Sequence, residues 1–341
     1  MGLIERKERN VESIISKLPE QIAKNLRAMF IEKRSSIHSK VTYAQALEAW
    51  WRFTEVDPLS ATKEDIRRFL DAASKEYKET TVDLFLMRLK TFVRWCLGEL
   101  TKPWESVKLG MSGKRGRDLR DKILSPEEVK ALVKAAERPK SKALLALLYE
   151  GALRVGEIRS LRIRDLEYTE HGFKLRITGK TGERVIPIID SAPYLRIWLQ
   201  MHPDPRNPNA PLFPGKGMNP IAEEAIYGIV SRAAERAGIR KKVHPHILRH
   251  TRLTELAKHL TEQELKVFSG WTKGSNMASV YVHLSGKDVE EAILRRVHGI
   301  ELPKRENTVR PLKPEVCPNC GYINPADAEF CMRCGYPLGE E

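Results

Sequence analysis

The run of residues from His244 to Thr251 places basic side chains where a helix should be apolar. Pro245 stands where a helix can begin, because its fixed φ suits the first helical position. The buried face is then marked by leucines at spacings of three and four: Leu253, Leu256 and Leu260. Carried back toward the N-terminus, the same face contains Arg249 and His246. Two interpretations stay open: a buried arginine paired with a carboxylate, or an anion-binding pocket at the start of the helix.

Two arginines and a tyrosine have the chemistry to cleave a phosphodiester without a metal ion. Such cleavage needs positive charge on the non-bridging oxygens, a nucleophile, and an acid that protonates the leaving oxygen. Arg154 and Arg249 each carry a planar fork of donors that fits a phosphate in a way that lysine cannot copy. Tyr281 is the candidate nucleophile. Taken singly, an arginine is more commonly an ion-pair residue and a tyrosine a core residue, so the interpretation depends on the set.

As an ordered set, these residues resemble the tyrosine recombinase family, which includes phage integrases and Xer-like proteins. The resemblance covers most of the chain and is strongest between Gly151 and His283. It implies that Lys180, which follows a glycine in a hairpin turn, is the general acid and that His246 is a base or hydrogen-bond donor. Glu157 resembles the family's supporting acidic residue; otherwise it would be an ordinary surface carboxylate. The catalytic set implied by the resemblance is Arg154, Lys180, His246, Arg249, Trp271 and Tyr281.

The chain departs from the commonest family pattern just before the tyrosine. Many members have Gly-His there, whereas this chain has Gly270 and Trp271. An indole N–H can still donate a hydrogen bond to a phosphate, but it cannot transfer a proton. The interval from Trp271 to Tyr281 is also one residue longer than usual, which concerns the placement of Tyr281 and not its identity.

Four cysteines near the C-terminus form two CxxC motifs, each followed by glycine: Cys317, Cys320, Cys331 and Cys334. Four thiolates at this spacing suit tetrahedral zinc, and the glycines permit tight turns. Two disulfides are the alternative, which a reducing compartment disfavours. With all four ligand positions filled, one zinc ion is structural, catalysis needs no cofactor, and so short a segment should need the metal to fold. Cys96 lies on an apolar helix, where core packing is the expected role.

Length and charge limit the class of protein. A chain of 341 residues should hold two or three domains. The formal charge of +14 favours a polyanionic partner, although ribosomal and membrane-surface proteins share that bias. The longest apolar run, 143–148, is too short to span a membrane, and the N-terminus lacks the apolar core of a signal peptide. We therefore expect a cytoplasmic protein with no membrane partner, and the resemblance to the tyrosine recombinases implies a prokaryotic protein that acts at the nucleoid.

The N-terminal third of the chain reads as helical. After an extension at 1–18, residues 19–109 show helical patterns with capping signals at Thr62–Asp65 and Thr80–Asp83, and Gly98 ends the second of these helices. The resemblance implies a core-binding domain here that clamps DNA. Basic residues available for phosphates are Lys40, Arg67, Arg68, Arg88, Lys90 and Arg94. A glycine-rich basic linker at 110–122 follows, with candidate DNA-binding residues Lys114, Arg115, Arg117 and Arg120.

The remaining segments predict a catalytic domain at 123–300, a linker at 301–314 and a zinc ribbon at 315–341. The catalytic domain begins with a capping box at Ser125–Glu128 and contains a β-hairpin formed by 173–178 and 183–188. Helices resume after a proline-rich loop. The predicted fold is therefore mainly α with a small antiparallel sheet in the catalytic domain (α+β), an all-α N-terminal domain and a small ribbon. A final helix at 288–297 carries an apolar stripe: Val289, Ile293 and Val297.

These observations predict a site-specific DNA recombinase that cleaves through a 3′-phosphotyrosyl link at Tyr281. The resemblance implies double-stranded DNA as the partner and a homotetramer on two DNA sites, in which the final helix docks on a neighbour. One alternative is a type IB topoisomerase, which would relax supercoils without strand exchange. Another is a non-catalytic factor in which the zinc ribbon binds DNA or protein; the intact set of candidate catalytic residues argues against it.

Overall fold

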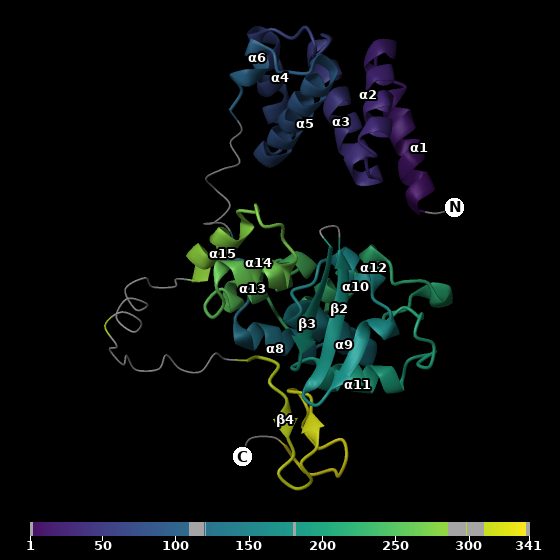
Figure 1. Cartoon of the computed structure of the whole chain (residues 1–341), viewed down its shortest axis with the longest axis vertical. Helices are drawn as coiled ribbons and strands as arrows, with labels where there is room; N and C mark the ends of the chain where they lie inside the picture. The colour runs from purple at the N-terminus through teal and green to yellow at the C-terminus, as the bar shows by residue number, and fades with distance from the viewer. Residues whose placement is uncertain are drawn as a thin grey trace. The chain divides into compact units, whose positions relative to one another are not determined.

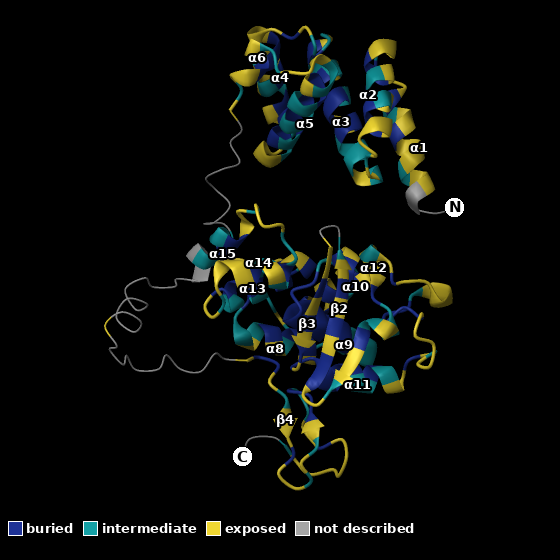
Figure 2. Ribbon diagram, viewed as in Figure 1, coloured by how far each residue is buried: buried dark blue, intermediate teal, exposed yellow. Residues whose placement is uncertain are grey.

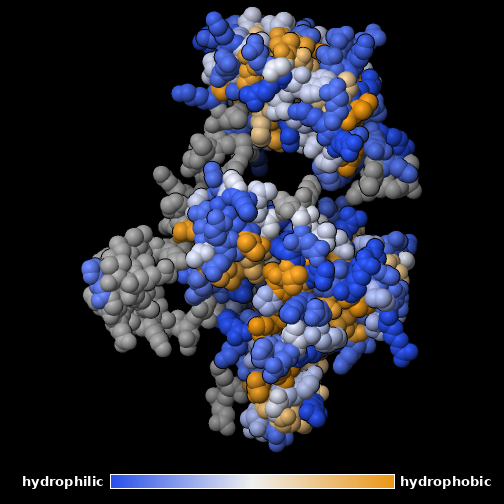
Figure 3. Space-filling model, viewed as in Figure 1, coloured by the Kyte–Doolittle hydropathy of each residue, from blue (hydrophilic) through white to orange (hydrophobic). Residues whose placement is uncertain are grey.

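The computed structural model describes residues 3–108, 119, 121–179, 182–285, 298 and 310–338. The chain divides into two compact units, Met1–Arg115 and Gly116–Glu341, called unit 1 and unit 2 (Figure 1). On the face seen in Figure 3, hydrophilic residues predominate and hydrophobic ones form small separate patches. Within the described residues, no helix combines the length and hydropathy needed to cross a bilayer.

Unit 1 consists of helices in its described part, as the sequence predicted. They are α1 (Leu3–Ile15), α2 (Glu20–Glu32), α3 (Ile37–Thr54), α4 (Lys63–Glu76), α5 (Glu79–Leu97) and the short α6 (Lys102–Glu105). Its core is rich in aromatic rings. Trp50 is fully buried and packs on Trp104 and Phe69, with ring centroids 5.0 and 5.3 Å away.

One of the two predicted caps in unit 1 is present and the other is wrong. Thr62 caps α4, because its side chain accepts from the backbone of Asp65 and the Asp65 carboxylate accepts from the backbone of Thr62. The helix α5 instead begins at Glu79, with Lys78 at the cap position and no side-chain cap bond. Thr80 therefore lies inside the first turn, where its backbone is already helical. Gly98 ends α5 in the left-handed conformation, as expected.

Unit 2 packs helices against a three-stranded antiparallel sheet (Figure 1). The strands are β1 (Leu166–Thr169), β2 (Gly172–Gly179) and β3 (Gly182–Ile188). The helices are α8 (Pro126–Lys134), α9 (Pro139–Glu150), α10 (Val155–Ser160), α11 (Ala192–Gln200), α12 (Glu223–Arg236), α13 (Pro245–Leu256), α14 (Glu262–Ser269) and α15 (Met277–Ser285), with 3-10 turns η2 (Ile163–Asp165) and η3 (Lys216–Met218).

The predicted hairpin is present, and it has a third strand that the sequence did not reveal. Leu175 lies opposite Ile186 on β3 and opposite Leu166 on β1. Alternate residues of β2 and β3 are buried, which is the pattern of a sheet with one covered face (Figure 2). Helices α10 and α11 contact β2, and α14 contacts β3. The four residues of β1 are too few, and too exposed at Glu167 and Tyr168, for their periodicity to be recognised.

Within unit 2, the ribbon has its own two-stranded sheet and contacts the part of the unit that precedes it. Strand β4 (Glu315–Val316) pairs with β5 (Ile323–Asn324). Leu312 is fully buried within the hydrophobic core of unit 2. Ion pairs join Arg310 to Asp190 and Lys142 to Asp327. The last residues of the expected linker at 301–314 are therefore packed against the rest of unit 2.

Candidate active site

Glu157 is the centre of a buried ion-pair cluster in unit 2. It lies on α10 and is 6% exposed. Its carboxylate accepts from the backbone N and Nη1 of Arg154, at 2.9 and 2.7 Å. It also accepts two bonds from Arg184, at 3.0 and 2.9 Å. Burial by itself would raise the pKa of Glu157, but the hydrogen bonds from Arg184 and Arg154 outweigh it and lower that pKa to about 2.

Arg249 adds a third guanidinium to this cluster. It lies on α13, is 4% exposed, and has Nη1 3.9 Å from the Glu157 carboxylate. Burial, followed by the charge of Arg154, lowers the pKa of Arg249 to about 10, so it remains a cation at neutral pH. Three guanidinium groups thus share one carboxylate among the described residues. Because buried charges are normally compensated, the excess positive charge creates a site for an anion.

The backbone around the cluster is shaped to hold these arginines. Ala152 has a φ of 45° just after α9, and its carbonyl accepts from Arg249 Nη1. The second amino group of Arg249 donates to the carbonyl of Ser269 at 2.9 Å. Gly270 has a φ of 65°, and a Cβ there would lie 2.7 Å from Arg184 Nη1. Glycine is therefore required at 270 both by the backbone conformation and by the close approach of Arg184.

Tyr281 lies on α15 beside this cluster, with two rings packed against its own. Its ring is 5.5 Å from that of Trp271 at an angle of 20°, and 5.7 Å from that of His250 at 27°. Its hydroxyl lies 2.6 Å from His250 Nδ1. Burial raises the pKa of Tyr281 to about 12, while the charges of Arg249 and Arg154 act in the opposite direction. The hydroxyl therefore lies within the field of the arginines that form the anion site.

The structure brings together five of the residues singled out in the sequence: Arg154, Glu157, Arg249, Trp271 and Tyr281. Arg249 lies 5.7 Å from the centroid of the Trp271 ring, which links the ion-pair cluster to the tyrosine. The leucine stripe predicted His246 on the buried face as well, but the structure leaves it exposed at the edge of the site, where its ring meets that of His250 at 5.6 Å. Partial burial, and then the charge of Arg249, lower the pKa of His246.

Other candidates fall outside the described residues. They are Lys180, the linker residues Lys114, Arg115, Arg117 and Arg120, and the whole final helix at 288–297. The roles expected for them remain predictions.

Two residues of the cluster were not in the predicted set, and each had left a signal in the sequence. Arg184 occupies an inward position of β3, in step with Ile186 and Ile188, where a charge is out of place. His250 is one residue after Arg249 and so lies off that residue's stripe. It is, however, four residues after His246, which places the two histidines on one face of α13.

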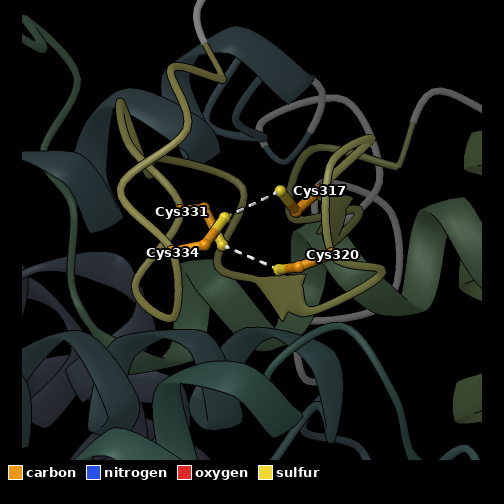
Figure 4. Close-up of side chains that lie close together, drawn as sticks. All are labelled: Cys317, Cys320, Cys331 and Cys334. Atoms are coloured by element: carbon orange, nitrogen blue, oxygen red, sulfur yellow. Dashed lines mark hydrogen bonds between the residues drawn. The ribbon is translucent and has the colours of Figure 1, made fainter.

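The four cysteines of the ribbon lie together, as predicted (Figure 4). Their sulfur atoms all lie within 4.8 Å of one another, and the pairs Cys317–Cys334 and Cys320–Cys331 are each 3.6 Å apart. Tetrahedral zinc with Zn–S bonds of about 2.3 Å places its sulfurs roughly 3.8 Å apart, so the spacing fits zinc. A disulfide would need about 2.05 Å.

Comparison with known proteins assigns the chain to a family. Residues 122–287 match the phage integrase family, residues 22–99 match the phage integrase N-terminal SAM-like domain, and residues 316–338 match a zinc-ribbon domain. The chain belongs to the phage integrase family of tyrosine recombinases. As a tyrosine recombinase it is a site-specific enzyme that cleaves and rejoins DNA. Nothing in these similarities favours a topoisomerase or a non-catalytic factor.

Relatives and solved structures agree with this assignment. The recombinase is 28% identical over 282 residues to the tyrosine recombinase XerC of Thermodesulfovibrio yellowstonii, covering 76% of this chain and 90% of that protein. Its fold is similar to XerH bound to its difH substrate (TM-score 0.61, 19% identity, 85% of this chain and 88% of that one). It is also similar to a lambda integrase dimer bound to a core site (TM-score 0.62, 18% identity, 84% and 99%).

Proposed function

We propose that Tyr281 is the nucleophile of strand cleavage and forms a 3′-phosphotyrosyl link. The observation that carries this is the position of its hydroxyl, held beside a buried cluster in which three arginines share the carboxylate of Glu157. A phosphate drawn to that excess charge comes close to Tyr281. Because the tyrosine is 1% exposed, DNA must displace part of its cover to reach it.

Each remaining step is assigned to a side chain of this chain. Arg154 and Arg249 neutralise the non-bridging oxygens, and Glu157 fixes Arg154 in place. The indole of Trp271 donates a hydrogen bond to the phosphate, and His246 assists at its edge. Lys180 protonates the departing 5′-oxygen. Since arginines supply the charge and Tyr281 the nucleophile, no step depends on a metal ion at the phosphate.

The ribbon holds one structural zinc ion through its four cysteines. All four sulfurs converge on one point, so a bound zinc would have no open position for a substrate. Its contribution is to cross-link two turns of a segment that has little core of its own.

The partner is double-stranded DNA, and the working assembly is a homotetramer on two sites, formed in the cytoplasm. The charge of +14 and the basic linker at 110–122 support contact with the phosphate backbone. A solved relative of similar fold, lambda integrase, forms a tetramer bound to a Holliday junction. In this chain the helix expected at 288–297 supplies an apolar stripe for the neighbouring subunit.

A nicked suicide duplex tests the nucleophile. The enzyme should become covalently attached to the DNA, and the attached peptide should contain Tyr281. Tyr281→Phe should bind the duplex like the parent and give no adduct, whereas Tyr227→Phe, at an exposed tyrosine of α12, should react like the parent. An adduct that persists in Tyr281→Phe would place the nucleophile elsewhere.

A further inference from the structure

His250 is the described residue that directly contacts the hydroxyl of the proposed nucleophile. Its Nδ1 lies 2.6 Å from Tyr281 Oη, and the two rings are stacked at 27°. The side chains come from α13 and α15, two helices in contact. The hydroxyl is thereby directed at a nitrogen that can accept its proton when the imidazole carries its own proton on Nε2.

We propose that His250 is the base that takes the proton of Tyr281 during strand cleavage. The inference rests on the proposed function, in which Tyr281 attacks the phosphorus. As the bond from Oη to phosphorus forms, the Oη–H bond breaks and the proton passes to His250 Nδ1. The bond from phosphorus to the 5′-oxygen breaks, and that oxygen receives a proton from Lys180.

The same two groups run the rejoining step in reverse. The incoming 5′-hydroxyl attacks the phosphorus and gives its proton to Lys180. The Tyr281 oxygen leaves and recovers its proton from His250. No proton is gained or lost over the full cycle, so the reaction needs no further reactant.

His250 is better placed for this role than His246. A general base must lie about 2.6–3.2 Å from the atom whose proton it takes, and His250 meets this condition. The described contact of His246 is with the ring of His250, at 5.6 Å and 86°. His246 is thus one residue removed from the hydroxyl, at the exposed edge where it can meet the phosphate.

Burial and the neighbouring charges keep His250 neutral, which is the protonation state that a base needs before it can accept a proton. The pKa of His250 is lowered to about 4, chiefly by burial and then by the charges of His246, Arg249 and His244. The imidazole is therefore neutral at pH 7. The group that faces His250 from α15 is Tyr281, and burial raises the pKa of this tyrosine to about 12. A bound phosphodiester adds a negative charge to this cluster, which favours the imidazolium that forms on attack.

Single-turnover cleavage of the suicide duplex between about pH 6 and pH 9 tests the proposal. His250→Ala removes the base and the hydrogen bond. His250→Asn keeps a polar group near the position of Nδ1, but that group cannot take up a proton at neutral pH. His171→Ala, at an exposed histidine in the turn between β1 and β2, is the control. Binding of the duplex by each variant verifies that it is folded.

Both His250 variants should cleave about 10²–10⁴-fold more slowly than the parent. Their rates should rise about tenfold per pH unit, because Tyr281 must then ionise unaided and its pKa is about 12. The parent, whose base is already neutral, should lack that dependence. Added imidazole should accelerate His250→Ala and leave His171→Ala unchanged.

Three results would overturn the assignment. A parental rate in His250→Asn would make His250 a positioning residue, and a slow rate with the parental pH profile would make it structural. Faster cleavage by His250→Ala would show that the contact restrains Tyr281. Identifying the peptide attached to the DNA distinguishes these three results from a failure of the proposed function. A DNA adduct on any residue other than Tyr281 would reject Tyr281 as the nucleophile.

Discussion

Glu157→Gln removes the carboxylate that three arginines share, and it should lower the free energy of unfolding of unit 2 by about 3 kcal/mol. The magnitude follows from the pKa of Glu157, which lies at about 2 in the folded chain against its usual 4.5. At about 1.4 kcal/mol per pH unit, this difference is worth about 3 kcal/mol at neutral pH. The side chain is only 5% exposed, so solvent screening removes little of it.

The sign of the pH dependence is fixed by the direction of that pKa. Because the folded value lies below the unfolded one, the stabilisation is complete above about pH 4.5 and is lost as the pH falls toward 2. The difference between parent and Glu157→Gln should thus be full at pH 7 and should shrink between about pH 5 and about pH 2.

Hydrogen exchange in the full-length chain measures the difference in unfolding free energy between parent and Glu157→Gln for unit 2 alone. Peptides from α9 and β2 report the unfolding of unit 2 separately from unit 1. Glu167→Gln is the matched control, because Glu167 on β1 is exposed and its ion pair with Lys174 is weak, with the charged atoms as far as 4.0 Å apart. Arg184→Met should cost less in the Glu157→Gln background than alone, since the two side chains interact directly. A loss below about 1 kcal/mol, or a difference that does not change with pH, would refute this account of the cluster.

Two further predictions concern the general acid and the metal. Lys180→Ala should slow cleavage of normal DNA by about 10²–10⁴-fold and should be rescued by a 5′-bridging phosphorothiolate, because a thiolate with a conjugate-acid pKa of about 8.5 leaves with little protonation. Arg249→Ala should be slow on both substrates in the same single-turnover assay, and a failure of sulfur to rescue Lys180→Ala would remove the lysine from the acid role. A chelator that strips zinc should unfold residues 315–338, seen by proteolysis or hydrogen exchange, and leave cleavage at Tyr281 intact. Loss of the phosphotyrosyl adduct on a short duplex after chelation would show that the ribbon is not remote from catalysis.

Local patterns in the sequence predicted which faces are buried. The leucine stripe of α13 led to Arg249, which the structure buries at 4% exposure. Alternation predicted the β2–β3 hairpin, and the cysteine spacing predicted four converging thiols. In each case the signal lies within about one element, because helical and strand periodicities are properties of neighbouring residues.

The sequence did not predict which buried faces meet each other. The bond between His250 and Tyr281 spans 31 residues, and the pair of Glu157 with Arg184 spans 27. Both depend on how separate elements pack, which no local period records. The wrong cap at Thr80 has a different cause: α5 already begins at Glu79, so Thr80 is inside the first turn, and a capping signal locates a helix start only to within one or two residues.

The end of α9 connects the arginine cluster to the ribbon. Glu150, its last residue, is buried and accepts from the backbone N atoms of Ile189, Asp190 and Ser191, at 2.7–2.8 Å. Asp190 in turn pairs with Arg310, at the start of the segment that leads into the ribbon. The next turn of the chain contains Ala152, whose carbonyl holds Arg249.

This arrangement explains why removing zinc and deleting the chain from Arg310 onward should affect the stability of unit 2 differently. Arg310 and Leu312 precede the first cysteine, so their contacts with unit 2 do not require a folded ribbon. Loss of zinc should release the pairs of Asp327 with Lys142 and of Glu329 with Lys134, but should leave the pair of Asp190 with Arg310 and the hydrogen bonds accepted by Glu150 in place. A truncation before Arg310 removes those contacts as well, and it exposes the core beneath Leu312. Cleavage should therefore survive the chelator, whereas the shorter chain should also lose stability in unit 2.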